Sequence, residues 1–238
     1  MGILDSIVID QIPLQLNLDT LAKSLRIKSG SAYLQDFQQL FDAALAIGKP
    51  RAFYRLAYVD EKGENYVVID GVRFTSRILR MNLEAAHRVF VYVATCGQEL
   101  ETWAAGFDNL LHRFWADAIS EAALRVASQA LNDHLTQQYQ PGNTSHMNPG
   151  SLPEWPITEQ VPLFGLLGDV RGAIGVYLTE SLLMMPRKSV SGLEFPTEVN
   201  FASCQLCPRQ NCPNRRAPYD PTLVAHYQPT VVTKPLAN

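Results

Sequence analysis

Three cysteines lie close together near the C-terminus, and thiolates are both metal ligands and redox groups. Cys204, Cys207 and Cys212 have the spacing C-x2-C-x4-C. A turn brings two thiolates with this short separation to one metal, and the third closes a face of the same site. Pro208 and Pro213 stiffen the loop. The pattern predicts an iron–sulfur cluster that relays electrons or a structural zinc site, and three reduced thiols without metal are the alternative.

The local sequence supplies only three of the ligands that such a site needs. The fourth is predicted to be Cys96, a histidine such as His226, or an exogenous ligand. Cys96 follows an apolar stretch, a position that is also typical of a small core residue. Arginines within and after the cysteine segment would offset the negative charge of the thiolates and favour metal binding; they are Arg209, Arg215 and Arg216.

The composition narrows the classes of function. The 238 residues carry a formal net charge of −3 and the pI is about 5.9, so an overall basic surface for nucleic acid is excluded. The sequence has no run of about 18 apolar residues, so no membrane-spanning segment is expected. Its first residues lack the basic and apolar regions of a signal peptide, and a cytoplasmic location is therefore expected.

Hydrophobic periodicity and turn signals predict both helices and strands, which is typical of an α+β domain. Asp19 and Ser31 are predicted helix caps. The predicted helices cover residues 19–27, 31–48, 75–86, 99–107, 110–138 and 160–168, and the predicted strands cover 51–59, 65–69, 89–95, 173–178 and 189–195.

The chain divides into three stretches that are expected to form one compact unit. Residues 1–50 predict an N-terminal helical segment packed on the main domain, and residues 51–195 predict an α+β core. Residues 196–238 predict an irregular, cysteine-bearing C-terminal extension, because prolines are frequent there and periodicity is weak. The last 20 residues are expected to form a surface tail or an extended partner-binding arm.

Two segments resemble a known family. Residues 178–192 read L-T-E-S-L-L-M-M-P-R-K-S-V-S-G and resemble the L-T-E-S-x-x-M-x-P-x-x-S-V-S-G stretch of the activation domain of vitamin B12-dependent methionine synthase. Residues 146–156 read H-M-N-P-G-S-L-P-E-W-P and resemble the R-x-x-P-G-Y loop of that family. Together with residues 95–97 and the long predicted helix, the resemblance covers roughly residues 75–195.

The resemblance implies a methionine synthase activation domain-like fold, with a twisted antiparallel sheet and flanking helices, to which this chain adds its C-terminal extension. It also implies binding of S-adenosyl-L-methionine and support for the reductive methylation of an inactive corrinoid. The sequence has no D-x-H-x-x-G corrinoid-binding motif, so cobalamin is expected on a partner, either a corrinoid-binding protein or methionine synthase. An electron donor is a further expected partner, and the cysteine cluster is the predicted relay.

Candidate ligand-binding residues come from the two segments and from the long helix. A Pro-Gly turn lets backbone approach a ligand closely, carboxylates favour a cationic sulfonium, and small hydroxyl groups supply hydrogen bonds. The candidates are His146, Asn148, Gly150, Ser151, Glu180, Ser181 and Glu121.

Two positions depart from the family pattern. His146 stands where the family has a ligand-binding arginine, and histidine lacks the fixed cationic fork that binds a carboxylate. Ser151 stands where the family has tyrosine, which removes an aromatic surface. These two changes favour an alternative function, a non-catalytic binding or structural protein that kept the fold and holds structural zinc or no metal.

Overall fold

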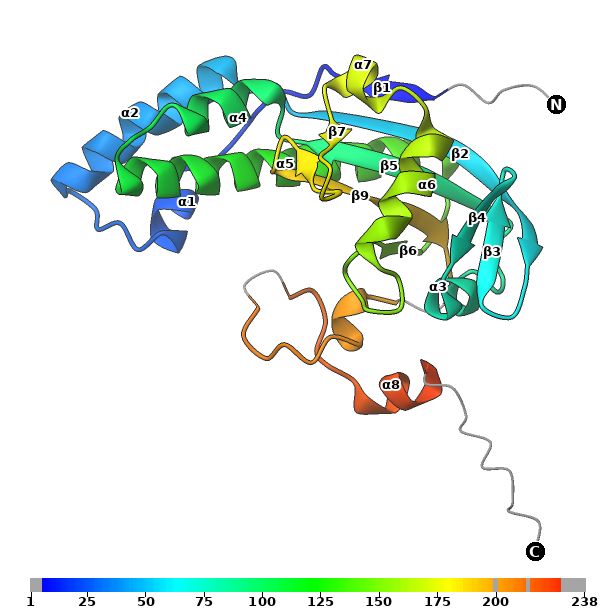
Figure 1. The fold of residues 1–238 in the computed structure, drawn as a ribbon. Coiled ribbons are helices and arrows are strands. Elements are labelled where there is room, and N and C mark those ends of the chain that lie inside the picture. The colour runs from blue at the N-terminus through cyan, green and yellow to red at the C-terminus, as the bar shows by residue number, and fades with distance from the viewer. Residues whose placement is uncertain (1–5, 199–200, 213–214, 228–238) are drawn as a thin grey trace, which may run out of the picture.

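The computed structural model describes residues 6–198, 201–212 and 215–227. Its centre is a seven-stranded sheet with the order β4-β3-β2-β5-β9-β6, and β1 also pairs with β2 (Figure 1). Every one of these pairings is antiparallel. The predicted α+β fold with an antiparallel sheet and flanking helices is therefore confirmed.

The strands of the sheet vary widely in length. The strands are β1 (Ile7–Ile9), β2 (Arg51–Lys62), β3 (Tyr66–Ile69), β4 (Val72–Thr75), β5 (Arg88–Thr95), β6 (Thr144–Met147) and β9 (Ser189–Pro196). The central strand β5 is buried along nearly its whole length, because both faces of the sheet are covered. A separate two-stranded hairpin pairs β7 (Tyr177–Leu178) with β8 (Met184–Met185).

The helices lie on both faces of the sheet and beyond one of its ends (Figure 1). They are α1 (Leu18–Ser24), α2 (Ala32–Ile47), α3 (Arg77–Asn82), α4 (Gln98–Ala105), α5 (Leu110–Tyr139), α6 (Gln160–Leu167), α7 (Val170–Ile174) and α8 (Pro221–Tyr227), with short 3-10 turns at Ile157–Glu159 and Ser203–Gln205. None of the helices in the described ranges combines the length and apolarity that crossing a bilayer requires.

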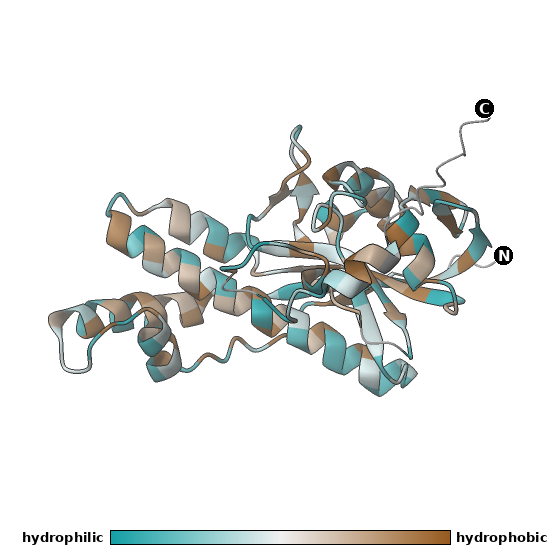
Figure 2. Cartoon of the chain, turned by 90° about the horizontal axis from the view of Figure 1, so that it is seen from below, coloured by the Kyte–Doolittle hydropathy of each residue, from teal (hydrophilic) through white to brown (hydrophobic). Residues whose placement is uncertain are grey.

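Successive side chains of β5 point to opposite faces of the sheet and therefore belong to different hydrophobic cores. Val89, Val91 and Val93 belong to a core beneath α3, α6 and α7. Phe90 and Tyr92 point to the other face, where the C-terminal half of α5 packs. A third core joins α2, α4 and the first half of α5. Figure 2 shows the hydrophobic and hydrophilic colours alternating along the helices, as expected of helices that bury one face.

Several local predictions need correction. The cap of α1 is Asn17, whose side chain accepts a hydrogen bond from the backbone N–H of Thr20, rather than Asp19. The strand predicted over 173–178 is mostly wrong, because Asp169 caps α7 and only Tyr177–Leu178 is extended. The expected tail contains α8, where the side chain of Asp220 accepts hydrogen bonds from the first turn. Ser31 caps α2 as predicted.

Candidate functional site

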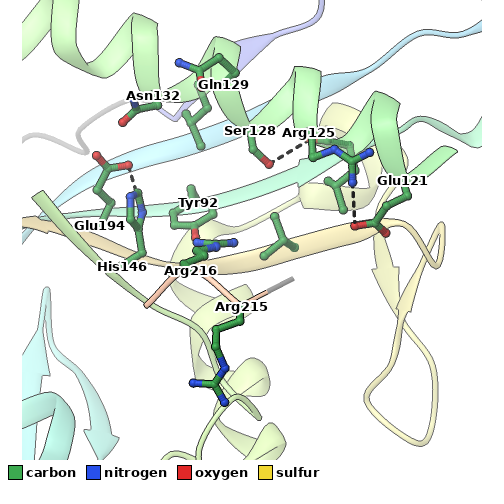
Figure 3. Close-up of a pocket in the computed structure, with 13 residues that line it drawn as sticks. Tyr92, Glu121, Arg125, Ser128, Gln129, Asn132, His146, Glu194, Arg215 and Arg216 are labelled. Carbon is green, nitrogen blue, oxygen red and sulfur yellow. Dashed lines mark hydrogen bonds and ion pairs between the residues drawn. The ribbon is translucent and has the colours of Figure 1, made fainter. Parts of the chain in front are cut away.

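An open cleft of about 660 Å³ lies between the polar face of α5 and the strands β5, β9 and β6 (Figure 3). Helix α5 forms one wall, and β5, β6 and β9 form the floor. The C-terminal extension closes the third side. The lining side chains that matter below are Tyr92, Glu121, Arg125, His146, Glu194 and Arg216. The cleft therefore joins residues from five parts of the chain: β5, α5, β6, β9 and the C-terminal extension.

The floor of the cleft depends on a close approach between β9 and the end of β6 with the first residue after it. Gly192 lies opposite Tyr92 in the strand register. A Cβ atom at Gly192 would lie 2.4 Å from the carbonyl oxygen of Met147 and 2.5 Å from Nδ2 of Asn148. A glycine is thus needed here because of space. This requirement gives the last residue of the S-V-S-G stretch a structural reason.

Asn148 fixes the loop after β6 to the floor. Its amide donates one hydrogen bond to the Tyr92 hydroxyl at 2.9 Å and another to the Ser191 carbonyl oxygen at 2.8 Å. Both N–H groups of the side chain are therefore used within the protein. Asn148 was predicted to contact a ligand, and its geometry is that of a residue that positions the loop.

His146 and Glu194 face each other across β6 and β9. His146 Nδ1 lies 3.6 Å from Glu194 Oε2. Burial, together with the charge of Arg216, lowers the pKa of His146 to about 4. Burial also raises the pKa of the Glu194 carboxyl, whose side chain is 2% exposed, although a hydrogen bond with Thr144 opposes this. At neutral pH the imidazole is therefore uncharged.

The wall formed by α5 carries a charge network. The Glu121 carboxylate lies 3.6 Å from Arg125 Nη1 and 3.4 Å from Lys188 Nζ. Lys188 also pairs with Asp117 at 2.9 Å. Glu121 was predicted to bind a ligand and does line the cleft. Two cations, Arg125 and Lys188, already compensate its negative charge. A free anionic group for a sulfonium is thus not available from Glu121 alone.

Two consecutive arginines bring the C-terminal extension to the cleft. The guanidinium of Arg215 donates hydrogen bonds to the carbonyl oxygens of Cys204 at 2.9 Å, Cys207 at 3.1 Å and Ala217 at 3.1 Å, and also to that of Arg209. Figure 3 shows Arg215 pointing away from α5 and Arg216 lying beside Tyr92. The sequence predicted these arginines only as counter-charges for thiolates. Their place in the cleft depends on the path of an irregular segment, which no periodic signal reveals.

The comparison with solved structures identifies the fold. The chain is similar to the "Crystal Structure of the MetH Reactivation Domain bound to AdoHcy", with a TM-score of 0.57 and 17% sequence identity over 84% of this chain and 81% of that chain. No family model and no curated protein matches the sequence. At this level of identity, the similarity to the MetH reactivation domain shows a common fold.

Gly150 and Ser151 shape the loop rather than line the cleft. Gly150 has a φ of +82°, which favours glycine, and its N–H donates to the Trp155 carbonyl oxygen at 2.8 Å. The Ser151 hydroxyl donates to the Asn148 carbonyl oxygen at 2.6 Å and contacts the Ser203 hydroxyl at 3.4 Å. This loop therefore contacts the extension, and a direct ligand contact from either residue stays a prediction.

Glu180 and Ser181 lie in the turn between β7 and β8. Both are exposed, and neither lines the cleft. The Ser181 hydroxyl lies 3.1 Å from the Thr179 hydroxyl, which also accepts a hydrogen bond from the N–H of Leu183. The turn is thus stabilised internally. The structure does not bring these two candidates together with His146, and their ligand role stays a prediction.

The predicted metal ligands are not gathered into one site. Cys96 is fully buried in the core between α2, α4 and α5, and burial raises its pKa to about 12. All four cysteines are free thiols. In the part of the chain that the structure describes, no three side chains of His, Cys, Asp or Glu are placed to hold a metal ion. The side chain of His226 lies outside the described part. Among the described side chains, therefore, none form a site for an iron–sulfur cluster or zinc, and metal binding by the cysteines stays a prediction.

Proposed function

We propose that the cleft binds an S-adenosyl ligand and that the protein supports reductive methylation of a corrinoid on a partner protein. One observation carries this proposal. The cleft joins His146 from the 146–156 segment, Val190 from the 178–192 segment and Glu121 from α5, which are the three parts that the family resemblance singles out. The fold similarity to a domain solved with AdoHcy bound supports the same conclusion.

The dimensions and lining of the cleft suit a ligand of this class. Small-molecule sites typically have volumes of about 300–1,000 Å³ and combine apolar walls with a few polar groups. Leu124, Leu131 and Val190 supply apolar surface, and Tyr92 supplies an aromatic ring. Hydroxyl and amide groups from Ser128 and nearby residues of α5 border this surface. An adenosyl group with a polar amino-acid portion has matching chemistry.

The proposed reaction needs a methyl donor, an electron and a corrinoid. A donor would supply one electron to the partner's inactive corrinoid, and the reduced corrinoid would accept the methyl group from the sulfonium of S-adenosyl-L-methionine, which leaves AdoHcy. The role of this chain would be to hold the methyl donor in the cleft. The corrinoid belongs to a corrinoid-binding protein or methionine synthase, because this sequence lacks the corrinoid motif.

An electron relay in the C-terminal extension is a separate part of the proposal. The described side chains form no metal-binding group. The relay is therefore supported by the C-x2-C-x4-C spacing of Cys204, Cys207 and Cys212 alone. Anaerobic purification followed by iron, sulfide and zinc analysis decides between the alternatives. Iron and sulfide near stoichiometry would support the relay, zinc would support a structural site, and absence of all three would leave free thiols.

A non-catalytic binding protein is the second candidate, and one observation favours it. His146 is uncharged at neutral pH where the family resemblance places a cationic arginine. The fold would then serve a partner protein without a small-molecule ligand. Titration calorimetry separates the two candidates, because only the first predicts saturable binding of S-adenosyl-L-methionine.

A reconstituted methylation assay tests the proposed function. The full chain is mixed anaerobically with a cobalamin-loaded methionine synthase that lacks its own reactivation domain, S-adenosyl-L-methionine and titanium(III) citrate as reductant. We expect methylcobalamin absorbance to rise faster with the chain than without it. Ser128→Trp places a bulky side chain in the cleft from α5. This variant should abolish the increase, which shows that the effect depends on the cleft. Equal rates with and without the chain would contradict the proposal.

A further inference from the structure

The cationic groups that line the cleft differ in how far they are already paired. Arg125 lies against Glu121 at 3.6 Å. The guanidinium of Arg215 already donates hydrogen bonds to backbone carbonyl oxygens in and just after the cysteine loop. The guanidinium of Arg216, by contrast, has no hydrogen-bond or ion-pair partner among the residues that the structure describes. A guanidinium in a ligand cleft with all its donors unused is suited to bind an anion.

Arg216 lines the strand end of the cleft, which is the part formed by strands, beside Tyr92 of β5 and His146 of β6 (Figure 3). Burial raises the pKa of Tyr92 to about 12 and the positive charge of Arg216 opposes this rise, whereas at His146 the same charge adds to the burial that lowers the pKa. Because His146 stays uncharged at neutral pH, it does not compete with Arg216 for an anion. A neutral imidazole also supplies a hydrogen-bonding group beside the cation. The strand end of the cleft thus has one available positive charge and nearby polar groups.

The position of Arg216 is set by the segment around it. Its backbone N–H lies 3.4 Å from Cys204 Sγ, as in a weak hydrogen bond. The neighbouring Arg215 ties together the carbonyl oxygens of Cys204 and Cys207. The cysteine loop and Arg215 therefore form a scaffold that presents Arg216 to the cleft. This arrangement gives the C-terminal extension a role in the site that does not depend on a metal.

We infer that Arg216 binds the carboxylate of the ligand's amino-acid portion, so that the C-terminal extension completes the ligand site. This inference rests on the proposed function, because it names the group in the same cleft that recognises one part of an S-adenosyl ligand. A monoanionic carboxylate suits the site better than a phosphate dianion, since the carboxyl groups of Glu194 and Glu121 also line the cleft.

Two ligands that differ in the carboxylate-bearing portion test the inference by calorimetry on the full chain. AdoHcy contains the amino-acid portion, and 5′-methylthioadenosine keeps the adenosyl thioether without it. Arg216→Ala should weaken AdoHcy binding by about 10- to 100-fold, the usual effect of losing a charged hydrogen bond, and leave 5′-methylthioadenosine binding unchanged. Arg216→Lys, which keeps the charge but loses the fork, should give an intermediate loss.

Arg209→Ala is the matched control, because Arg209 is an exposed arginine of the same extension that does not line the cleft. It should leave the binding of both ligands unchanged. The inference is overturned if Arg216→Ala binds AdoHcy as tightly as the natural chain, or if it weakens both ligands equally. If the natural chain binds neither ligand, the proposed function fails as well. If it binds both and only the Arg216 effect is missing, the inference alone fails.

Discussion

The amide of Asn148 donates a 2.9 Å hydrogen bond to the hydroxyl of Tyr92. This bond joins the loop after β6 to the central strand β5 and passes directly over Gly192. The edge of the sheet and the loop that resembles the R-x-x-P-G-Y segment are thereby held as one surface. The geometry of the cleft floor therefore depends on these three residues together.

Gly192→Ala should destabilise the protein by about 1–3 kcal/mol, as overpacking of a tight site does. The added methyl group would meet the Met147 carbonyl oxygen and the Asn148 amide, and neither can move without breaking β6 pairing or the Tyr92 hydrogen bond. Urea unfolding followed by circular dichroism measures the change. Gly165→Ala is the control, because nothing lies within 4 Å of its added Cβ. Equal stability of Gly192→Ala and the natural chain would show that the close approach is not real.

The ring of His146 should titrate near pH 4 in the folded protein. Because this folded pKa lies below the unfolded value of about 6.5, the unfolded chain takes up the proton first as pH falls. The contribution of His146 to stability is therefore full above pH 6.5 and is lost between about pH 6.5 and 4. Side-chain NMR measures the midpoint, and Arg216→Ala should raise it. A midpoint at the ordinary histidine value would contradict the influence of partial burial and of Arg216 on the ring.

Local signals predicted much of the fold, because helix caps, turns and apolar periodicity are properties of neighbouring residues. Ser31 was found in this way, as were the buried strand β5 and the long helix α5. Strand β6 was missed, since its four residues T-S-H-M show no strong alternation. It forms only because β9 offers a free edge. Strand β6 is thus determined by its pairing with a distant strand and not by its own sequence.

The site was predicted less completely than the fold. His146 and Glu121 were named from the sequence and do line the cleft. Arg216 also lines the cleft but was not named as a cleft residue, because the extension that carries it has no periodic pattern that would show its path. Glu180 and Ser181 belong to a segment with a specific resemblance, yet the structure puts them in an exposed turn outside the cleft lining. The spacing of residues in the sequence does not show whether their side chains reach the same cleft.

The four thiols should differ sharply in reactivity. Cys96 is fully buried and its pKa is raised to about 12, so almost none of it is thiolate at pH 8. Iodoacetamide applied to the native protein at pH 8 should modify Cys204, Cys207 and Cys212 and spare Cys96. Peptide mass spectrometry measures the extent at each site, and urea-unfolded protein serves as the control with all four labelled. Labelling of Cys96 at the rate of the others in native protein would disprove its core position.

Glu101→Ala should destabilise the protein by about 1–3 kcal/mol. The buried Glu101 carboxylate on α4 accepts hydrogen bonds from the backbone N–H of Arg187 at 3.0 Å and from its Nε at 2.9 Å. Removing it leaves the backbone donor unpaired. Glu101→Gln retains one acceptor and should lose less. Thermal or urea unfolding of both variants gives the comparison, and equal losses would argue that the effect comes from packing alone.

Equilibrium dialysis of radiolabelled AdoHcy against the full chain tests the central claim most directly. The account predicts saturable binding of a single ligand per chain in the natural protein and its loss in folded Ser128→Trp, whose side chain fills the cleft. Circular dichroism confirms that the variant is folded. Absence of binding to the natural chain, or binding that Ser128→Trp leaves intact, would contradict the assignment of the cleft as an S-adenosyl ligand site.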